Sequence, residues 1–354
     1  MNTKPFFFDL SLESLKAELK SIGLPDFRAK QLFQAFYVDL VAGVEDVTTL
    51  SKDLRQKLSE KMVFSKLKPI QRMLSTDGET IKTLFELPDG RTIETVLMHY
   101  DERQTLCISS QAGCAMNCVF CATGQMGFAR NLTTGEIVEQ VLHFARELKQ
   151  TGNSVTNVVV MGMGEPFNNY EAVMAAVDLL NDPLTLNLGA RRITISTVGL
   201  VPEILRFASE KRQINLAISL HAANDELRAS LLPIDKKYPL YELMLACREY
   251  IEQTHRRLTF EWALIQGVND QEKDAYELAK ILKGMICHVN LIQLNPTKKY
   301  QGKTPSTATA LAFQAILTEN GIPCTIRLRR GIDIHAGCGQ LASHQKTSQK
   351  TDMI

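Results

Sequence analysis

The chain has 354 residues, a net charge of +1 and a hydrophobic fraction of 45%, which suffices for one large domain with a small addition. The net charge excludes a global basic field that would attract nucleic acid, so any RNA contact must come from local patches. Eight cysteines are too few for a disulfide scaffold and favour a metal site in a reducing cytoplasm. No apolar stretch has the length of a signal peptide or a membrane span, so we expect a soluble protein with no membrane partner.

The N-terminal region changes its hydrophobic period once. Apolar residues recur at helical spacing in the segments 11–22, 26–37 and 51–62. After residue 70 the period becomes two, and the turn sequences at 76–78 and 88–90 predict hairpins. We therefore predict a helical accessory module at residues 1–70 and a β-hairpin extension at residues 71–98.

From about residue 99 predicted strands and helices alternate. The strands are predicted at 105–109, 156–162, 192–197, 214–220, 258–265, 289–294 and 324–328, and the helices at 133–150, 169–181, 201–211, 239–254, 270–284 and 306–320. This alternation implies an α/β fold with a parallel sheet covered by helices, here a partial (β/α)6 barrel at residues 99–340. Its chemistry should lie at the carboxyl ends of the strands. A polar tail is expected at 341–354.

A cysteine cluster directly follows the first strand of this barrel. Cys114, Cys118 and Cys121 have the spacing Cys-x3-Cys-x2-Cys. Three thiolates can hold three irons of a [4Fe-4S] cluster. The fourth iron then keeps an open, reactive coordination position. Zinc is the alternative, but it requires four ligands and the chain has no second cysteine pair, so Cys107 or a distant His would have to complete the set.

Polar residues also follow four other predicted strands. A glycine turn, Gly162-Met163-Gly164, leads to Glu165, and the other three strand ends carry Ser196-Thr197, Ser219-Leu220-His221 and Asn295. Glycine lets the backbone approach a ligand closely, and a carboxylate could accept from an ammonium group. Each residue alone could be a strand cap. Four such ends on one face of a barrel suggest a shared pocket.

Cys107 and Cys338 are the cysteines that lie outside both the cluster and the expected core. Cys338 lies between two glycines in a polar loop, a poor place for core packing, and Cys107 should lie at the mouth of the barrel. The cysteines in apolar helix or strand patterns are expected to be inert: Cys247, Cys287 and Cys324.

Together these motifs resemble the RlmN/Cfr family of radical S-adenosylmethionine (SAM) RNA methyltransferases. The resemblance runs from Pro25 to Cys338 and rests on Thr-Leu-Cys-x-Ser-Ser-Gln-x-Gly-Cys-x3-Cys-x2-Cys-Ala-Thr, Gly-Met-Gly-Glu-Pro, Ser-Leu-His and Cys-Gly-Gln-Leu. It implies a [4Fe-4S] cluster on the three clustered cysteines and SAM on the open iron. The residues expected to bind SAM are Gly164, Glu165, Ser196, Ser219, Leu220, His221 and Asn295.

The resemblance also implies a substrate and a route. The family methylates an adenosine of 23S rRNA, RlmN at C2 and Cfr at C8, and RlmN often also modifies the adenosine beside the tRNA anticodon. Cys338 would receive a methyl group from one SAM, and a radical from a second SAM would activate that methyl for addition to adenine. Cys107 would then attack Cys338 and release the product, leaving a disulfide for a thiol reductant to reset. Glu94 matches a glutamate treated as a proton acceptor, and an electron donor such as flavodoxin or ferredoxin is implied.

Two local sequence details bear on the resemblance and on the choice between the RlmN and Cfr branches. His335-Ala336-Gly337 stands where the family usually has an acidic residue and two alanines, and Pro166 favours the C2 branch. A C8-specific Cfr-like enzyme remains the alternative, as does a non-catalytic metal-containing RNA-binding protein. Phosphates could bind to basic residues near the strand ends: Arg191-Arg192, Lys236-Lys237, Arg327, Arg329 and Arg330.

Overall fold

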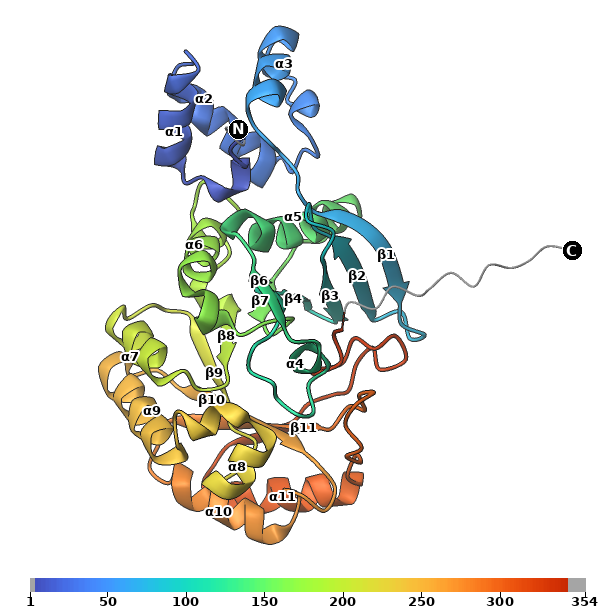
Figure 1. Cartoon of the computed structure of the whole chain (residues 1–354), viewed down its shortest axis with the longest axis vertical. Coiled ribbons are helices and arrows are strands. Elements are labelled where there is room, and N and C mark those ends of the chain that lie inside the picture. Colours follow the sequence, from blue (N-terminus) through green and yellow to red (C-terminus); the bar gives the residue numbers. More distant parts are fainter. Residues whose placement is uncertain (1–3, 343–354) are drawn as a thin grey trace, which may run out of the picture.

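The computed structural model describes residues 4–342. A helical module at one end joins a large α/β body (Figure 1). The module contains a 3-10 turn at Phe7–Asp9, α1 at Leu12–Ser21, α2 at Phe27–Phe33, a π turn at Gln34–Val38, a second 3-10 turn at Val44–Asp46 and α3 at Lys52–Lys61. Ser11 starts α1 because its hydroxyl accepts from the N–H of Ser14. The module closes around packed aromatic rings, including Phe7, Phe36 and Tyr37.

One mixed sheet of ten strands forms the centre of the described body, in the order β1-β2-β3-β4-β7-β8-β9-β10-β11-β12. The first four strands pair antiparallel: β1 Lys68–Leu74, β2 Thr80–Glu86, β3 Thr92–Tyr100 and β4 Arg103–Cys107. From β4 onward the pairs are parallel: β7 Asn157–Val160, β8 Ile193–Thr197, β9 Asn215–Ser219, β10 Leu258–Leu264, β11 Cys287–Gln293 and β12 Cys324–Ile326. The predicted α/β class with a partial parallel barrel is confirmed. The hairpin strands continue the same sheet through the β3–β4 pair.

Helices connect and cover the parallel strands: α5 Thr134–Gln150, α6 Tyr170–Asn181, α7 Val201–Ser209, α8 Asp225–Leu231, α9 Leu240–Thr254, α10 Glu272–Leu282 and α11 Thr307–Glu319. Short 3-10 turns lie at Pro166–Asn169, Ala190–Arg192 and Pro233–Lys236. The capping box of Thr133 and Glu136 starts α5. A short ribbon, β5 Gln111–Gly113 with β6 Phe128–Asn131, encloses α4 Ala122–Met126. None of the described helices is long and apolar enough to cross a membrane.

Helix α5 anchors the N-terminal module to the sheet. The carboxylate of Glu139, on α5, accepts from Lys66 N–H at 2.9 Å, Leu67 N–H at 3.1 Å and the Ser65 hydroxyl. The ring of Phe6 packs so closely on Gly135 that a Cβ there would lie 2.4 Å from a ring carbon. The chain between α3 and β1 is therefore fixed at the point where module and body meet.

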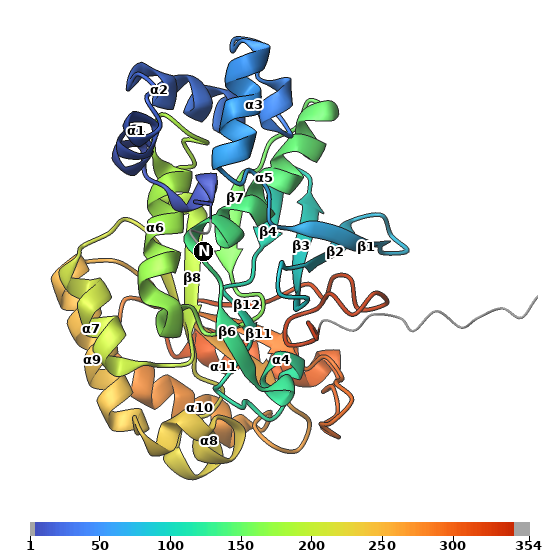
Figure 2. The ribbon, with the colours of Figure 1, turned by 45° about the horizontal axis from the view of Figure 1, so that its top comes forward.

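The segment after β12 turns back beside β1–β3, as the rotated view shows (Figure 2). Asp333 accepts from the N–H and hydroxyl of Thr76 at 2.8 Å each. Leu341 and Ala342, which were predicted to begin a polar tail, are instead buried. The carbonyl of Leu341 accepts from the Thr123 hydroxyl, and Ala342 N–H donates to Glu94. The rest of the predicted tail, 343–354, lies outside the described residues.

Candidate active site

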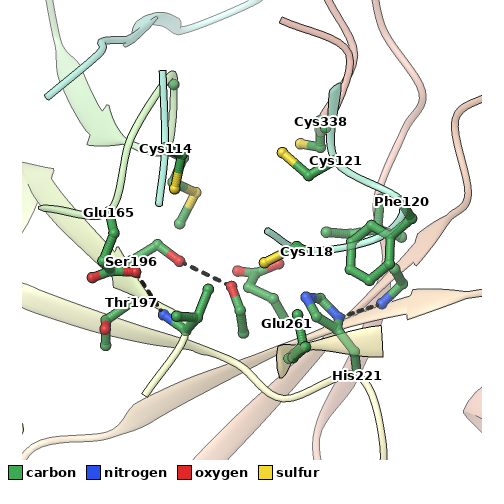
Figure 3. A pocket seen from close by; sticks show the side chains of 18 of the residues that line it. Cys114, Cys118, Phe120, Cys121, Glu165, Ser196, Thr197, His221, Glu261 and Cys338 are labelled. Carbon is green, nitrogen blue, oxygen red and sulfur yellow. Dashed lines mark hydrogen bonds between the residues drawn. The ribbon is translucent and has the colours of Figure 1, made fainter. Parts of the chain in front are cut away.

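The cysteine loop leaves β5 and lines a cavity at the carboxyl ends of the parallel strands (Figure 3). This cavity, called the cluster cavity below, measures about 990 Å³ including its open mouth, a size that suits a ligand of cofactor dimensions. Cys114 and Cys118 are buried and Cys121 is half-buried at the start of α4. Gly113 makes the tight entry to the loop. Its φ is +79°, and a Cβ would lie 2.0 Å from the carbonyl oxygen of Gly127.

The donor set of the loop fits an iron–sulfur cluster. Burial raises the pKa of Cys114 to about 12 and that of Cys118 well above its ordinary value, so metal binding must displace their protons. Among the described residues no group of three or more His, Cys, Asp or Glu side chains is placed to hold a single metal ion. A cluster does not require such convergence, because each thiolate binds its own iron.

Gly164 and Glu165 lie beside the cysteines on the wall of the cluster cavity. Gly164 has a φ of +108°, a backbone conformation that favours glycine. The Glu165 carboxylate is buried and accepts from Phe167 N–H at 3.0 Å and Val198 N–H at 2.9 Å. Burial nevertheless raises the pKa of Glu165 to about 7. Its oxygens keep free lone pairs that a bound ammonium group could use.

The neighbouring strand ends bring the expected polar residues to the wall of the cluster cavity. Ser196 and Ser219 line the cluster cavity with their hydroxyl oxygens 3.5 Å apart. His221 also lines it, and its Nδ1 accepts from Ala263 N–H at 2.9 Å. Burial lowers the pKa of His221 to about 3, so the ring is neutral with its proton on Nε2. Leu220 is fully buried and does not line the cavity, because its side chain faces the core.

Asn295 lies where the cysteine loop and the C-terminal loop meet. It lines the cluster cavity, but its amide donates to the carbonyl of Cys338 at 3.1 Å and accepts from Arg329 Nε at 3.2 Å. Cys338 is exposed and lines the same cavity next to Cys121 (Figure 3). Asn295 therefore holds the Cys338 loop in place.

A second cavity brings the two lone cysteines together. Cys107 at the end of β4 and Cys338 both line it, together with Cys121, Arg327 and Tyr100. Burial raises the pKa of Cys107 to about 12, so this thiol is protonated in the resting protein. We call this space the thiol cavity. The expectation that Cys107 lies at the mouth of the barrel agrees with this position.

Glu94 lies behind the thiol cavity and does not line it. Its carboxylate forms a buried ion pair with Lys82 at 3.0 Å and accepts from Ala342 N–H at 2.9 Å. The Lys82 ammonium also donates to the carbonyl of His335 at 3.1 Å. The Lys82–Glu94 pair thus binds the Cys338 loop on both sides, at residues 335 and 342.

Glu261 and Phe120 are among the lining residues of the cluster cavity that sequence reasoning missed. Glu261 is buried on β10, 3.7 Å from Arg327, and one of its oxygens has no hydrogen-bond partner among the described residues. Phe120 packs edge-on against His221 with ring centroids 5.0 Å apart. A glutamate within the apolar run of β10 was the available signal for the first. The ring contact of Phe120 is tertiary and leaves no local signal.

The basic residues singled out in the sequence occupy different places. Arg327 is inside, lining both cavities, whereas Arg330 lies over the ring of Tyr100 at 4.3 Å on the rim of the thiol cavity. Arg191 donates to Gln213 at the opposite, amino-terminal end of the strands. Lys236 and Lys237 are exposed beside the cysteine loop.

Comparisons with known proteins agree with this geometry. Residues 108–279 match the Radical SAM superfamily, and residues 7–64 match the ribosomal RNA large subunit methyltransferase N-terminal domain. The dual-specificity RNA methyltransferase RlmN 1 of Myxococcus xanthus is 48% identical, covering 99% of this chain and 98% of that protein. The probable dual-specificity RNA methyltransferase RlmN of Chloroflexus aurantiacus is 47% identical, with 97% and 94% covered.

A solved structure gives the same result in three dimensions. The crystal structure of a radical SAM methyltransferase from Sphaerobacter thermophilus is 50% identical and superposes with a TM-score of 0.94, covering 96% of this chain and 100% of that one. The aligned region includes both the N-terminal module and the barrel. The chain therefore belongs to the RlmN family of radical SAM RNA methyltransferases.

Proposed function

We propose that this enzyme methylates C2 of an adenosine in 23S rRNA and of the adenosine beside the anticodon in tRNA, with Cys338 as the methyl carrier. The observation that carries the proposal is the thiol cavity, where Cys107, Cys338 and the cluster-loop residue Cys121 meet. RNA methyltransferase relatives with dual specificity support the two RNA substrates. An enzyme that acts on these substrates would work in the cytoplasm.

The residues of the two cavities have different proposed roles. Cys114, Cys118 and Cys121 would hold the [4Fe-4S] cluster, and Gly164, Glu165, Ser196, Ser219 and His221 would hold SAM beside it. When bound, the cluster and SAM supply the radical chemistry. Cys338 presents its sulfur between the two cavities, which lets it take a methyl group on one side and meet adenine on the other. Asn295 acts by positioning that loop.

Cys107 would release the product. The thiolate of Cys107 attacks the sulfur of Cys338, the electron pair of the bond between that sulfur and the methylene carbon passes to the carbon, and the carbon takes up a proton to become the methyl group. The Cys107 proton must leave first, because burial keeps its pKa high. The resulting disulfide requires two electrons from a thiol reductant. An electron donor such as flavodoxin or ferredoxin would supply the electron that reduces the cluster before a radical can form. The role of Glu94 as a proton acceptor stays a prediction.

Expression of cysteine variants in cells tests the proposal. Cys107→Ala should carry covalently attached RNA that survives denaturation, because the carrier works but its link to RNA cannot be resolved. Cys338→Ala should carry none and form no product, with its cluster intact. Mass spectrometry of nucleosides from wild-type reactions should find 2-methyladenosine. If neither variant carries covalently attached RNA, the two-thiol route is refuted. If 8-methyladenosine is the product instead of 2-methyladenosine, the enzyme belongs to the Cfr branch.

A further inference from the structure

The loop that carries the cluster cysteines reaches the surface at one place. Cys114 and Cys118 are buried, but Ala115 and Asn117, each adjacent to one of them in the chain, are exposed. These residues line an open groove together with Met116, Pro233, Ile234, Lys236 and Lys237. Cys114 and Cys118 line the cluster cavity, so neighbouring residues of one loop line the groove and that cavity.

The groove is basic. Lys236 and Lys237 are its charged lining residues, no carboxylate lines it, and within the described part of the chain neither lysine has an ion-pair partner. The adjacent Asp235 does not neutralise them, because it is buried in a pair with Arg228 at 2.6 Å. The apolar floor contains Met116 and Ile234, which pack partly on the core. A basic rim around an apolar centre suits an acidic protein partner.

The groove also lies on a different side from the substrate entrance. The thiol cavity, where the substrate adenine is proposed to bind, is lined by Tyr100 of β3 and by residues of the 327–341 segment, beside the β1–β3 sheet. The groove lies next to α8 and the turn that follows it, and both views place α8 well away from β1–β3 (Figures 1 and 2). A partner in the groove would reach the cysteine loop without displacing a substrate from either cavity.

We propose that this groove, at Ala115–Asn117 and Lys236–Lys237, is the docking surface for an acidic one-electron carrier protein. The inference rests on the proposed function, which requires the cluster to be reduced by one electron before a radical can form. The carrier is oxidised by one electron and the cluster is reduced by one. Interfaces between transient electron-transfer partners are small, and the groove is lined by only seven residues. Opposite charges on the two partners mainly accelerate their association.

The lysines could instead contact RNA phosphates, so the test must separate the two partners. The variant Lys236→Glu/Lys237→Glu reverses the charge of the groove. Lys280→Glu/Lys283→Glu makes the same charge change on exposed lysines at the end of α10 and serves as the control. Reduced flavodoxin is the probe, and stopped-flow absorbance follows cluster reduction. RNA affinity and dithionite-driven methylation are measured in parallel.

We expect the groove variant to be reduced by flavodoxin about 10-fold more slowly than the control at low salt. The difference should disappear near 1 M salt, where screening acts within about 3 Å. Melting temperature, RNA affinity and dithionite-driven methylation should match the control. Equal reduction rates in both variants would overturn the proposal, and weakened RNA binding with a normal reduction rate would assign the groove to RNA. If wild type fails to methylate with dithionite, the proposed function itself fails.

Discussion

At the scale of single residues, Glu94 shows how a structural contact changes the interpretation of a motif. The family resemblance implies a proton acceptor, but the carboxylate is committed to Lys82 and to Ala342 N–H. Breaking a buried pair by removing one partner leaves an uncompensated charge, which costs about 3–5 kcal/mol. If Glu94 only holds the Cys338 loop, neutralising both Glu94 and Lys82 should restore activity. If Glu94 transfers a proton, the doubly neutralised protein should stay inactive.

We expect Glu94→Gln alone to lower stability and activity, and Lys82→Met/Glu94→Gln to recover stability and part of the activity. The double variant removes the unpaired ammonium, while the amide oxygen introduced at position 94 still accepts from Ala342 N–H. Melting temperatures and the yield of methylated RNA give the comparison. A double variant that is as stable as wild type but fully inactive would support the proton acceptor.

His221 should make stability sensitive to acid. Burial lowers its pKa to about 3, whereas the unfolded value is about 6.5. The folded state thus binds fewer protons between these values, so stability is complete above pH 6.5 and falls as the pH decreases. By pH 5 the loss from this group is about 2 kcal/mol.

His221→Asn should reduce that loss, since Asn tolerates the φ of +59° at this position and offers an acceptor to Ala263 N–H without titrating. Melting temperatures of both proteins at pH 7 and pH 5 provide the measurement. A decrease of the same size in the variant would show that other groups cause the acid sensitivity.

Predictability at this scale depends on whether a signal is local. The three cluster cysteines were found because their spacing lies within eight residues of sequence. Leu220 was assigned to SAM by its neighbours in a motif, but the strand end turns its side chain into the core. Asn295 lines the cluster cavity, and its expected role toward SAM stays a prediction. Its contacts with Cys338 and Arg329 depend on a loop more than 30 residues away.

At the scale of elements, the parallel strands were predictable because apolar β-branched runs mark buried strands strongly. The helices α4 and α8 were not predicted, since segments of 5 and 7 residues are too short to show helical periodicity. The hairpins were predicted as an extension, but their pairing with β4 makes them part of the main sheet. The hydrophobic pattern of a strand does not indicate which other strand it will pair with.

The anchor between α5 and the N-terminal module yields an element-scale prediction. Glu139→Ala leaves the buried N–H groups near Leu67 without an acceptor, which should destabilise the fold by about 2–4 kcal/mol. Glu147→Ala on the same helix is the control, because its pair with Arg72 is partly exposed and worth less than about 1 kcal/mol. Limited proteolysis near residues 62–68 and melting temperatures measure the effect. Equal stability of the two variants would show that the anchor is unimportant.

At the scale of the whole molecule, the two ends of the barrel sequence are joined at the site. Ala122 N–H donates to the carbonyl of Gly339 at 2.7 Å, and the Thr123 hydroxyl donates to that of Leu341 at 2.7 Å. Helix α4, which follows the last cluster cysteine, therefore contacts the Cys338 loop directly. Ordering of α4 should therefore also order the Cys338 loop through these hydrogen bonds.

We expect cluster reconstitution to slow amide hydrogen exchange at residues 335–342 as well as at 114–127, because metal binding fixes the cysteine loop and α4 with it. Exchange of metal-free and reconstituted protein, followed by mass spectrometry of peptides, measures this coupling. Peptides from α10 provide the control and should not change. Protection confined to 114–127 would show that the two loops order independently.

The position of Cys338 along the chain has a consequence for synthesis. Every described strand precedes it in the sequence, and domains form in the order in which they leave the ribosome. The cysteine loop, at residues 114–121, therefore leaves the ribosome long before the carrier thiol is translated. The nascent chain passes through a stage in which the three cluster cysteines are present without the sulfur to be methylated, and the site is complete only when the Cys338 loop docks between Lys82, Glu94 and α4.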